Sequence, residues 1–280
     1  MAKEYKNLTF TDDFVFGKVL TTNPELCKEL LELILCKKIT DIKLSEPQKT
    51  IKQAYHSKGI RLDVYVEDED TIYDIEMQTT FQKDLPKRTR YYQGIIDLNL
   101  IESGASYSEL KESYIIFICT SDPFGKNLPV YTFKNVCVED GTVVFTDSAT
   151  KIILNATGDR TGLSQNMAAF LDFLQNQKVS DKFTDQLSSE VCRVKQNKDW
   201  SVEYMHISAL LADTARENYN KGYDNGIEQG IEQGILKTIN ILFGMNVPSE
   251  QICVTISSQY GIDKNKATEY IAKAKQLNNN

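Results

Sequence analysis

The segment Gly59-Ile-Arg-Leu-Asp-Val-Tyr-Val-Glu-Asp-Glu-Asp-Thr-Ile-Tyr-Asp-Ile-Glu-Met-Gln78 decides the fold class of this chain of 280 residues. It predicts two short strands joined by an acidic turn, because apolar and polar residues alternate on both sides of the acidic run. Successive side chains of a strand point to opposite faces, so the polar residues of each strand share one face. The residues that matter most on these faces are Asp63, Asp74, Glu76 and Gln78.

The expected pairing of the two strands brings their acids together. A turn over residues 67–70 would pair Val66 with Thr71 and place Asp63 opposite Asp74. The two polar faces then become one face of the sheet, where several carboxylates converge beside apolar strands. Such a cluster is costly unless a cation is bound, so the segment predicts a metal site with oxygen ligands.

Helices and strands are expected on both sides of this hairpin. Thr11-Asp12-Asp13 is typical of a helix start, and the spacing of leucines predicts a second helix from Asn23 to about Leu35. Asp84-Leu-Pro86 opens a long helix that Gly104 is expected to close. Strands are expected at residues 114–120, 130–138, 142–146 and 151–154, and a helical pattern begins at Gly162.

Arg88 falls on the inward side of the long helix, together with Leu85, Tyr92 and Ile95. A guanidinium on an inward face needs an anionic partner, because its charge cannot be neutralised. That partner is either one of the nearby carboxylates or a DNA phosphate, and the sequence leaves both open.

The ordered set of motifs resembles a known family. Phe10-Thr-Asp-Asp-Phe-Val-Phe precedes the hairpin; Arg88-x-x-x-Tyr92, Gly104-x-x-Tyr107 and the apolar strand Tyr114–Thr120 follow it. This order is similar to that of the Rpn family, the recombination-promoting nucleases also labelled PD-(D/E)XK transposases. The resemblance implies an α/β fold: a restriction-endonuclease-like core, with a mixed sheet flanked by helices, followed by a helical C-terminal region.

The resemblance also implies an active site and its cofactor. Asp63, Glu76 and the main-chain carbonyl of Met77 would bind Mg²⁺ or Mn²⁺, and Asp74 and Tyr92 would support the site. Gln78 stands where many relatives have lysine; it could orient a water but supplies no charge, a deficit that Arg88 could fill. Asp13 would either reach the metal or cap its helix. Lys83, Lys87 and Arg90 would contact DNA, or would belong to an ordinary solvated face.

Composition excludes several other classes of protein. The net charge of −7 argues against a broadly basic nucleic-acid coat, and two histidines with six scattered cysteines make a zinc site improbable. No signal stretch or membrane-length apolar run is present, so we expect a reduced, cytoplasmic protein with no membrane association.

The C-terminal part contains a four-residue repeat. Gly222, Gly226, Gly230 and Gly234 recur between Tyr219 and Ile235, and isoleucines follow three of them. Each interior glycine costs a helix about 1 kcal/mol relative to alanine. The repeat is therefore either a loose linker or a helix whose glycines let a partner approach, and the regular isoleucines favour a helix that forms a homodimer. Two short helices follow, and their lysines permit a DNA-reading helix-turn-helix.

The expected domains are a nuclease-like domain at residues 1–180 and a helical region at residues 181–280. The leading functional prediction is a metal-dependent DNA endonuclease linked to recombination or mobile elements. The alternatives are a catalytically degenerate nuclease fold that binds DNA or protein, and an acidic surface hairpin without chemical function.

Overall fold

The computed structural model describes residues 3–44, 50–51, 60–101 and 104–278. The chain divides into two compact units, Ala2–Met205 and His206–Asn280, which we call the α/β unit and the helical unit. Each is described by itself. No helix within the described ranges combines the length and the apolar character that a membrane span requires.

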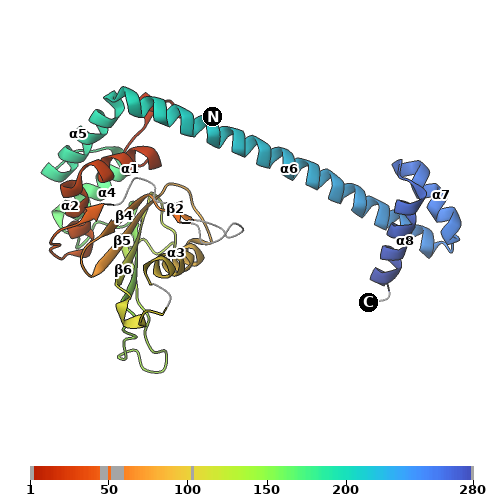
Figure 1. Cartoon of the computed structure of the whole chain (residues 1–280), viewed down its shortest axis with the longest axis horizontal. Coiled ribbons are helices and arrows are strands. Elements are labelled where there is room, and N and C mark those ends of the chain that lie inside the picture. Colours follow the sequence, from red (N-terminus) through yellow and green to blue (C-terminus); the bar gives the residue numbers. More distant parts are fainter. Residues whose placement is uncertain (1–2, 45–49, 52–59, 102–103, 279–280) are drawn as a thin grey trace. The chain divides into compact units, whose positions relative to one another are not determined.

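A six-stranded mixed sheet forms the centre of the α/β unit (Figure 1). Its strand order is β1-β4-β5-β6-β8-β7; β5, β6 and β8 run parallel, and the other neighbours are antiparallel. The strands are β1 (Lys43–Leu44), β4 (Val64–Glu67), β5 (Thr71–Gln78), β6 (Glu112–Cys119), β7 (Val130–Phe133) and β8 (Ala149–Asn155). A separate two-stranded sheet pairs β2 (Thr50–Ile51) with β3 (Ile60–Arg61).

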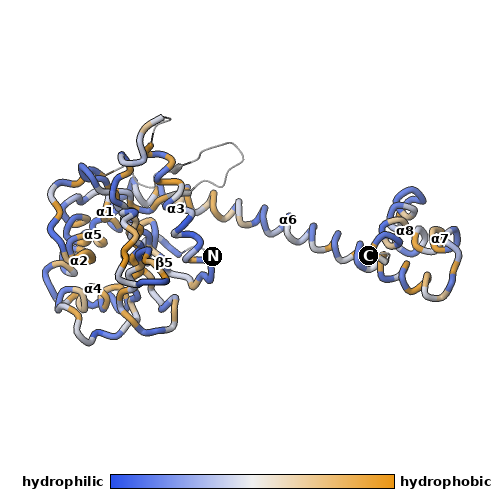
Figure 2. Tube along the Cα trace, turned by 90° about the horizontal axis from the view of Figure 1, so that it is seen from below, coloured by the Kyte–Doolittle hydropathy of each residue, from blue (hydrophilic) through white to orange (hydrophobic). Residues whose placement is uncertain are grey.

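Helices cover both faces of the six-stranded sheet. Figures 1 and 2 place α3 (Leu85–Leu100) on one face and four helices on the other: α1 (Asp13–Thr22), α2 (Pro24–Leu35), α4 (Gln165–Asn176) and α5 (Lys182–Gln196). There are also two short 3₁₀ helices, Tyr5–Asn7 before α1 and Tyr107–Glu109 between α3 and β6. Because β5 and β6 are parallel, the chain must cross over the sheet between them, and α3 is that crossover.

The core beneath α3 is continuous with the strands that carry the acidic motif. Leu85, Ile95 and Ile96 of α3 pack on Ile115 and Phe117 of β6, and all five are buried. Every residue of β5 is buried, which is typical of a central strand with helices on both sides. The polar side chains of β5 are therefore largely buried.

The acidic hairpin forms with a different register from the one expected. Val66 pairs with Tyr73 rather than with Thr71, and Tyr65, not Asp63, pairs with Asp74. The reason is a tight turn at Asp68, whose carboxylate accepts hydrogen bonds from the N–H groups of Asp70 and Thr71 at 3.1 and 2.9 Å. A shift of two residues keeps every side chain on its face, so only the partners change.

The first strand of the hairpin is interrupted. Ile60–Arg61 belongs to the small sheet with β2, and β4 begins only at Val64, so the chain bends at Asp63. The sequence pattern predicted one continuous strand here. The bend matters because it ends the β4–β5 ladder beside Glu76.

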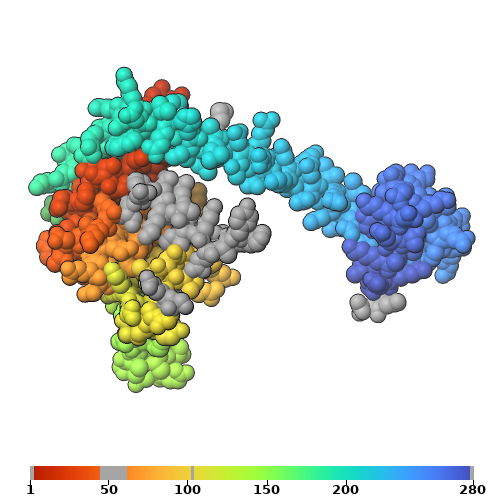
Figure 3. Space-filling model, in the orientation of Figure 1, coloured from red at the N-terminus to blue at the C-terminus, as the bar shows by residue number. Residues whose placement is uncertain are grey.

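Two further expectations were wrong in extent. The long helix ends at Leu100, before Gly104. The strand expected at residues 130–138 ends at Phe133, and residues 142–146 contribute only an isolated bridge between Val136 and Val144. Figure 3 shows this part of the chain as a green projection from the unit. Val138 within it is 93% exposed. Their alternating valines find no surface to pack against, and two strands alone are marginal.

The glycine repeat lies within one long helix, α6 (Lys198–Gly244). Its C-terminal end packs with α7 (Ser249–Tyr260) and α8 (Lys264–Asn278) around Ile235, Ile239, Ile252, Ile256 and Ile271.

In the α/β unit, α5 packs against α1, α2 and α4. The division at residue 180 remains a prediction.

Candidate active site

Asp63 and Glu76 are interlocked at the point where β4 begins. The N–H of Asp63 donates to Oε1 of Glu76 at 2.9 Å, and the N–H of Met77 donates to Oδ2 of Asp63 at 3.1 Å. Both carboxylates are buried. The two carboxylates meet because the β4–β5 ladder has ended at Val64 and Ile75. The N–H groups of Asp63 and Met77 therefore take no part in that ladder and donate to side chains instead. In a strand the N–H and C=O of one residue point the same way, so the carbonyl of Met77 points to the same side of β5 as the N–H that bonds Asp63.

Asp74 precedes Glu76 by two residues in β5, so its side chain lies on the same face of the strand. It is completely buried, and neither of its carboxylate oxygens has a hydrogen-bond partner among the described residues. Burial raises the pKa of Asp74 well above its ordinary value, and the nearby charge of Asp63 adds to this, while the adjacent Glu76 carboxyl and the charge of Arg88 act in the opposite direction. Burial likewise raises the pKa of Glu76, with contributions from Asp74 and Asp63.

The donor set fits a hard divalent cation. All the candidate ligands are oxygens. The two carboxylate oxygens of Asp74 have no hydrogen-bond partner among the described residues, and a cation nearby would stabilise them. The described residues do not contain three acidic, thiol or imidazole side chains close enough to enclose a metal ion. Mg²⁺ needs fewer, because it commonly binds one or two carboxylates and keeps several waters.

Arg88 reaches the site from α3. Its Nη1 donates to Oε1 of Gln78 and to Oε1 of Gln82, each at 2.6 Å, and its Nη2 donates to the Tyr92 hydroxyl at 3.1 Å. Burial alone would lower the pKa of Arg88, but the hydrogen bond to Tyr92 and the charge of Glu76 raise it. The guanidinium thus reaches the end of the acidic strand, but the groups that bond it here are neutral, whereas the sequence predicted a carboxylate or a DNA phosphate as its partner.

The other predicted residues differ in their placement. Asp13 is exposed at the first position of α1. One turn later, Gly17 lies against the carbonyl of Asp63, where an added Cβ would be 3.7 Å away, so α1 backs the bend of the chain. Lys83, Lys87 and Arg90 are all exposed, the first just before α3 and the others on it.

Gln82 is a site residue that the sequence did not reveal. It stands in the loop between β5 and α3, where periodicity carries no information. The four-residue spacing from Gln78 has no meaning outside a helix, and only the folded loop brings both glutamines to Arg88.

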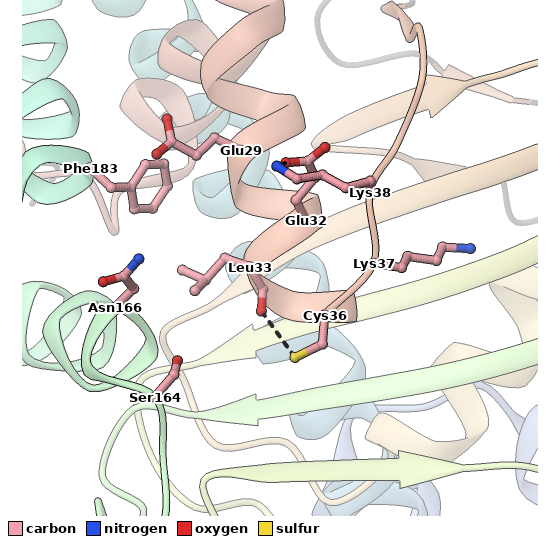
Figure 4. A pocket seen from close by; sticks show the side chains of 9 residues that line it. All are labelled: Glu29, Glu32, Leu33, Cys36, Lys37, Lys38, Ser164, Asn166 and Phe183. Carbon is pink, nitrogen blue, oxygen red and sulfur yellow. Dashed lines mark hydrogen bonds and ion pairs between the residues drawn. The ribbon is translucent and has the colours of Figure 1, made fainter.

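A cleft of about 390 Å³ lies elsewhere, where the end of α2 meets the start of α4 (Figure 4). Its lining mixes acids and bases: Glu29, Glu32 and Lys38 lie on one side with Ser164 and Asn166 on the other, and Lys37 borders it with its side chain extending away. None of the predicted site residues lines it. We therefore place the candidate active site at the Asp63–Glu76 bend.

Comparison with known proteins gives one match. Residues 10–229 match the family model described as PD-(D/E)XK nuclease family transposase. Neither a search of curated proteins nor a search of solved structures found a significant match.

Proposed function

Because the chain belongs to the PD-(D/E)XK nuclease family transposases, we propose that it is a metal-dependent DNA endonuclease that acts in recombination or in the movement of mobile elements. The observation that carries the proposal is the interlocked pair of Asp63 and Glu76, buried at the end of the β4–β5 ladder beside the unsatisfied carboxylate of Asp74.

The residues of the site have separate tasks in this proposal. Asp63, Glu76 and the carbonyl of Met77 hold Mg²⁺ or Mn²⁺, which would lower the pKa of a bound water and offset charge on the phosphate. Hydrogen bonds from backbone N–H groups fix both carboxylates before any ligand arrives. Arg88 presents a permanent positive charge to the scissile phosphate, the task that lysine has in many relatives.

Substrate binding is assigned to the exposed residues around the start of α3. Lys83, Lys87 and Arg90 would contact phosphates on either side of the scissile bond, because they are exposed and follow the catalytic strand in the chain. Charges that contact phosphate give affinity without sequence preference.

We further propose a homodimer that forms through α6, in the reducing environment of the cytoplasm. Tyr219, Tyr223, Ile227 and Ile231 are exposed along α6, and an added Cβ at Gly222, Gly226 or Gly230 would meet nothing within 4 Å. Such an apolar, glycine-lined face is suited to the close approach of a second helix.

A plasmid-nicking assay tests the proposed activity. Supercoiled DNA is incubated with the protein in Mg²⁺, Mn²⁺, Ca²⁺ or EDTA, and Asp63→Ala and Glu76→Ala are run beside the parent. We expect nicking with Mg²⁺ or Mn²⁺, none in EDTA, and loss of activity in both variants. Glu69→Gln, an exposed acid in the same hairpin, serves as the matched control. Equal nicking by all four proteins would refute the assignment of this site.

The alternative function is a degenerate nuclease fold that binds DNA or a protein without cutting. The presence of glutamine in place of the usual lysine favours it, because Gln78 carries no charge. It predicts DNA binding that EDTA and Asp63→Ala leave unchanged, with no nicking under any condition.

A further inference from the structure

The side chain of Gln78 is fully engaged with protein groups. Its Oε1 accepts from Arg88 at 2.6 Å, and its Nε2 donates to the carbonyl of Thr80 at 2.7 Å and lies 3.1 Å from the Thr80 hydroxyl. An amide has two donor hydrogens and one acceptor oxygen with two lone pairs. The Nε2 group and one lone pair of the oxygen have partners within the chain, so Arg88 and Thr80 hold this side chain at both ends.

Arg88 is held on several sides at once. Gln78 and Gln82 accept from Nη1, Tyr92 accepts from Nη2, and the guanidinium lies 5.4 and 5.3 Å from the ring centroids of Tyr92 and Phe117. These contacts fix a long side chain that would otherwise sample many rotamers. A charge that is already in place stabilises a transition state without reorganisation.

The two groups that accept from Nη1 of Arg88 are the neutral side-chain amides of Gln78 and Gln82. Their neutrality determines how they affect the charge of Arg88. A carboxylate at either position would orient the guanidinium equally well, but would form a salt bridge and cancel the charge. Amide oxygens orient Arg88 and leave its full positive charge available to a phosphate. Gln78, which stands in place of the usual lysine, carries no charge itself. It is therefore suited to orient the charged side chain of Arg88.

We propose that Gln78 and Gln82 are positioning residues, which together hold Arg88 as the cation that contacts the scissile phosphate. The proposal rests on the nuclease function proposed above, and it assigns Gln78 a task that differs from water positioning. Thr80 completes the arrangement because it anchors the other end of the Gln78 amide.

Relocating the charge tests the proposal. Gln78→Lys places an ammonium within bonding distance of Arg88, so the two cations repel; Arg88→Ala removes the original cation. Each single variant should lose cleavage by roughly 10²-fold, comparable to the loss of one charge-stabilising donor. The double variant Gln78→Lys/Arg88→Ala restores one cation to the site and should cleave at least ten times faster than either single variant.

The pH profile supplies a second readout. Arginine keeps its charge throughout the accessible range, so the parent loses no cation at high pH. In the double variant the cation is a lysine, whose ordinary pKa is about 10.4. Its cleavage should fall as the pH rises towards that value, relative to the parent at the same pH.

Gln78→Glu and Gln82→Glu separate orientation from charge. Both should keep Arg88 in place and leave DNA affinity, measured with Ca²⁺ in place of Mg²⁺, within about threefold of the parent, while cleavage falls at least tenfold. Gln186→Lys, at an exposed glutamine of α5, is the control for an added lysine and should leave cleavage unchanged. Thermal unfolding of every variant verifies that it is folded.

The outcomes are distinct for the two levels of the proposal. A parent chain that cuts no DNA refutes the nuclease function itself. A parent that cuts DNA, together with a Gln78→Lys variant that cuts as fast or a double variant no better than Arg88→Ala, overturns the positioning role and leaves the nuclease function standing.

Discussion

Replacing Asp74 by asparagine is expected to stabilise the metal-free protein, by an amount that grows as the pH rises. The carboxyl group of Asp74 is completely buried, and both its oxygens lack partners among the described residues. Burial, with the charge of Asp63, raises its pKa well above the ordinary value of 3.8. Asparagine has nearly the same shape and carries no charge, and its amide group can donate to the neighbouring carboxylates.

The sign follows from proton binding. At a pH between the ordinary and the raised pKa, the folded protein keeps a proton on Asp74 that the unfolded chain has lost. Stability falls with rising pH wherever the native state binds more protons than the unfolded state. The contribution of Asp74 to stability therefore falls as the pH rises above about 4, and the raised pKa of Glu76 acts in the same direction. Asp74→Asn removes the first contribution and, because Asp74 raises the pKa of Glu76, part of the second.

The size of the effect can be bounded. An unsatisfied buried polar group costs about 1–3 kcal/mol, and more when it is charged, and this additional cost of the ionised carboxylate is the part that depends on pH. For a unit of about 200 residues each kcal/mol shifts the melting temperature by roughly 2–4 °C. Asp74→Asn should thus melt at least about 2 °C above the parent at neutral pH, and the difference should shrink towards zero in acid, where the carboxyl group is protonated in both states.

Thermal unfolding in EDTA at several pH values between acid and mildly alkaline measures this difference. Glu69→Gln, in the same hairpin but exposed, is the matched control and should show no such pH dependence. A variant that is less stable than the parent by the same amount at every pH would refute the reasoning, because it would mean that Asp74 makes a stabilising bond in the folded state. Adding Mg²⁺ should narrow the gap by stabilising the parent more.

Two further predictions concern DNA binding and assembly. Alanine at Lys83, Lys87 and Arg90 together should weaken DNA binding and lower the salt dependence of the affinity by about 0.9 per lost phosphate contact, as fluorescence anisotropy over a salt series would show; an unchanged salt slope would place DNA elsewhere. Light scattering should report a dimer at micromolar concentration. Truncation after Asn218 should convert it to a monomer, and so should the double substitution Ile227→Asp with Ile231→Asp in the full chain. A monomeric parent would count decisively against the α6 interface.

Local pattern was enough to predict several elements of the fold. The apolar spacing of residues 24–35 specifies α2, and the apolar run of residues 114–119 specifies a buried central strand. These elements form as expected because each has a strongly apolar side and a surface to pack against. The valines at residues 136–144 also favour strands but have no such surface, and the strands expected there are reduced to one bridge. A periodic pattern forms a strand only where its apolar side chains can pack against another part of the protein.

The sequence by itself determined which residue types meet on the face of the candidate active site. A strand has a side-chain period of two, so Asp74, Glu76 and Gln78 had to share a face whatever the pairing, and a register shift of two residues left that face intact. Only the tertiary structure decided their partners. The turn at Asp68 set Asp63 beside Glu76, the bend before β4 freed the backbone groups that hold both carboxylates, and the loop before α3 brought Gln82 to Arg88. Those contacts join residues from different elements, and their geometry depends on the packing of α3 on the sheet, which no local pattern contains.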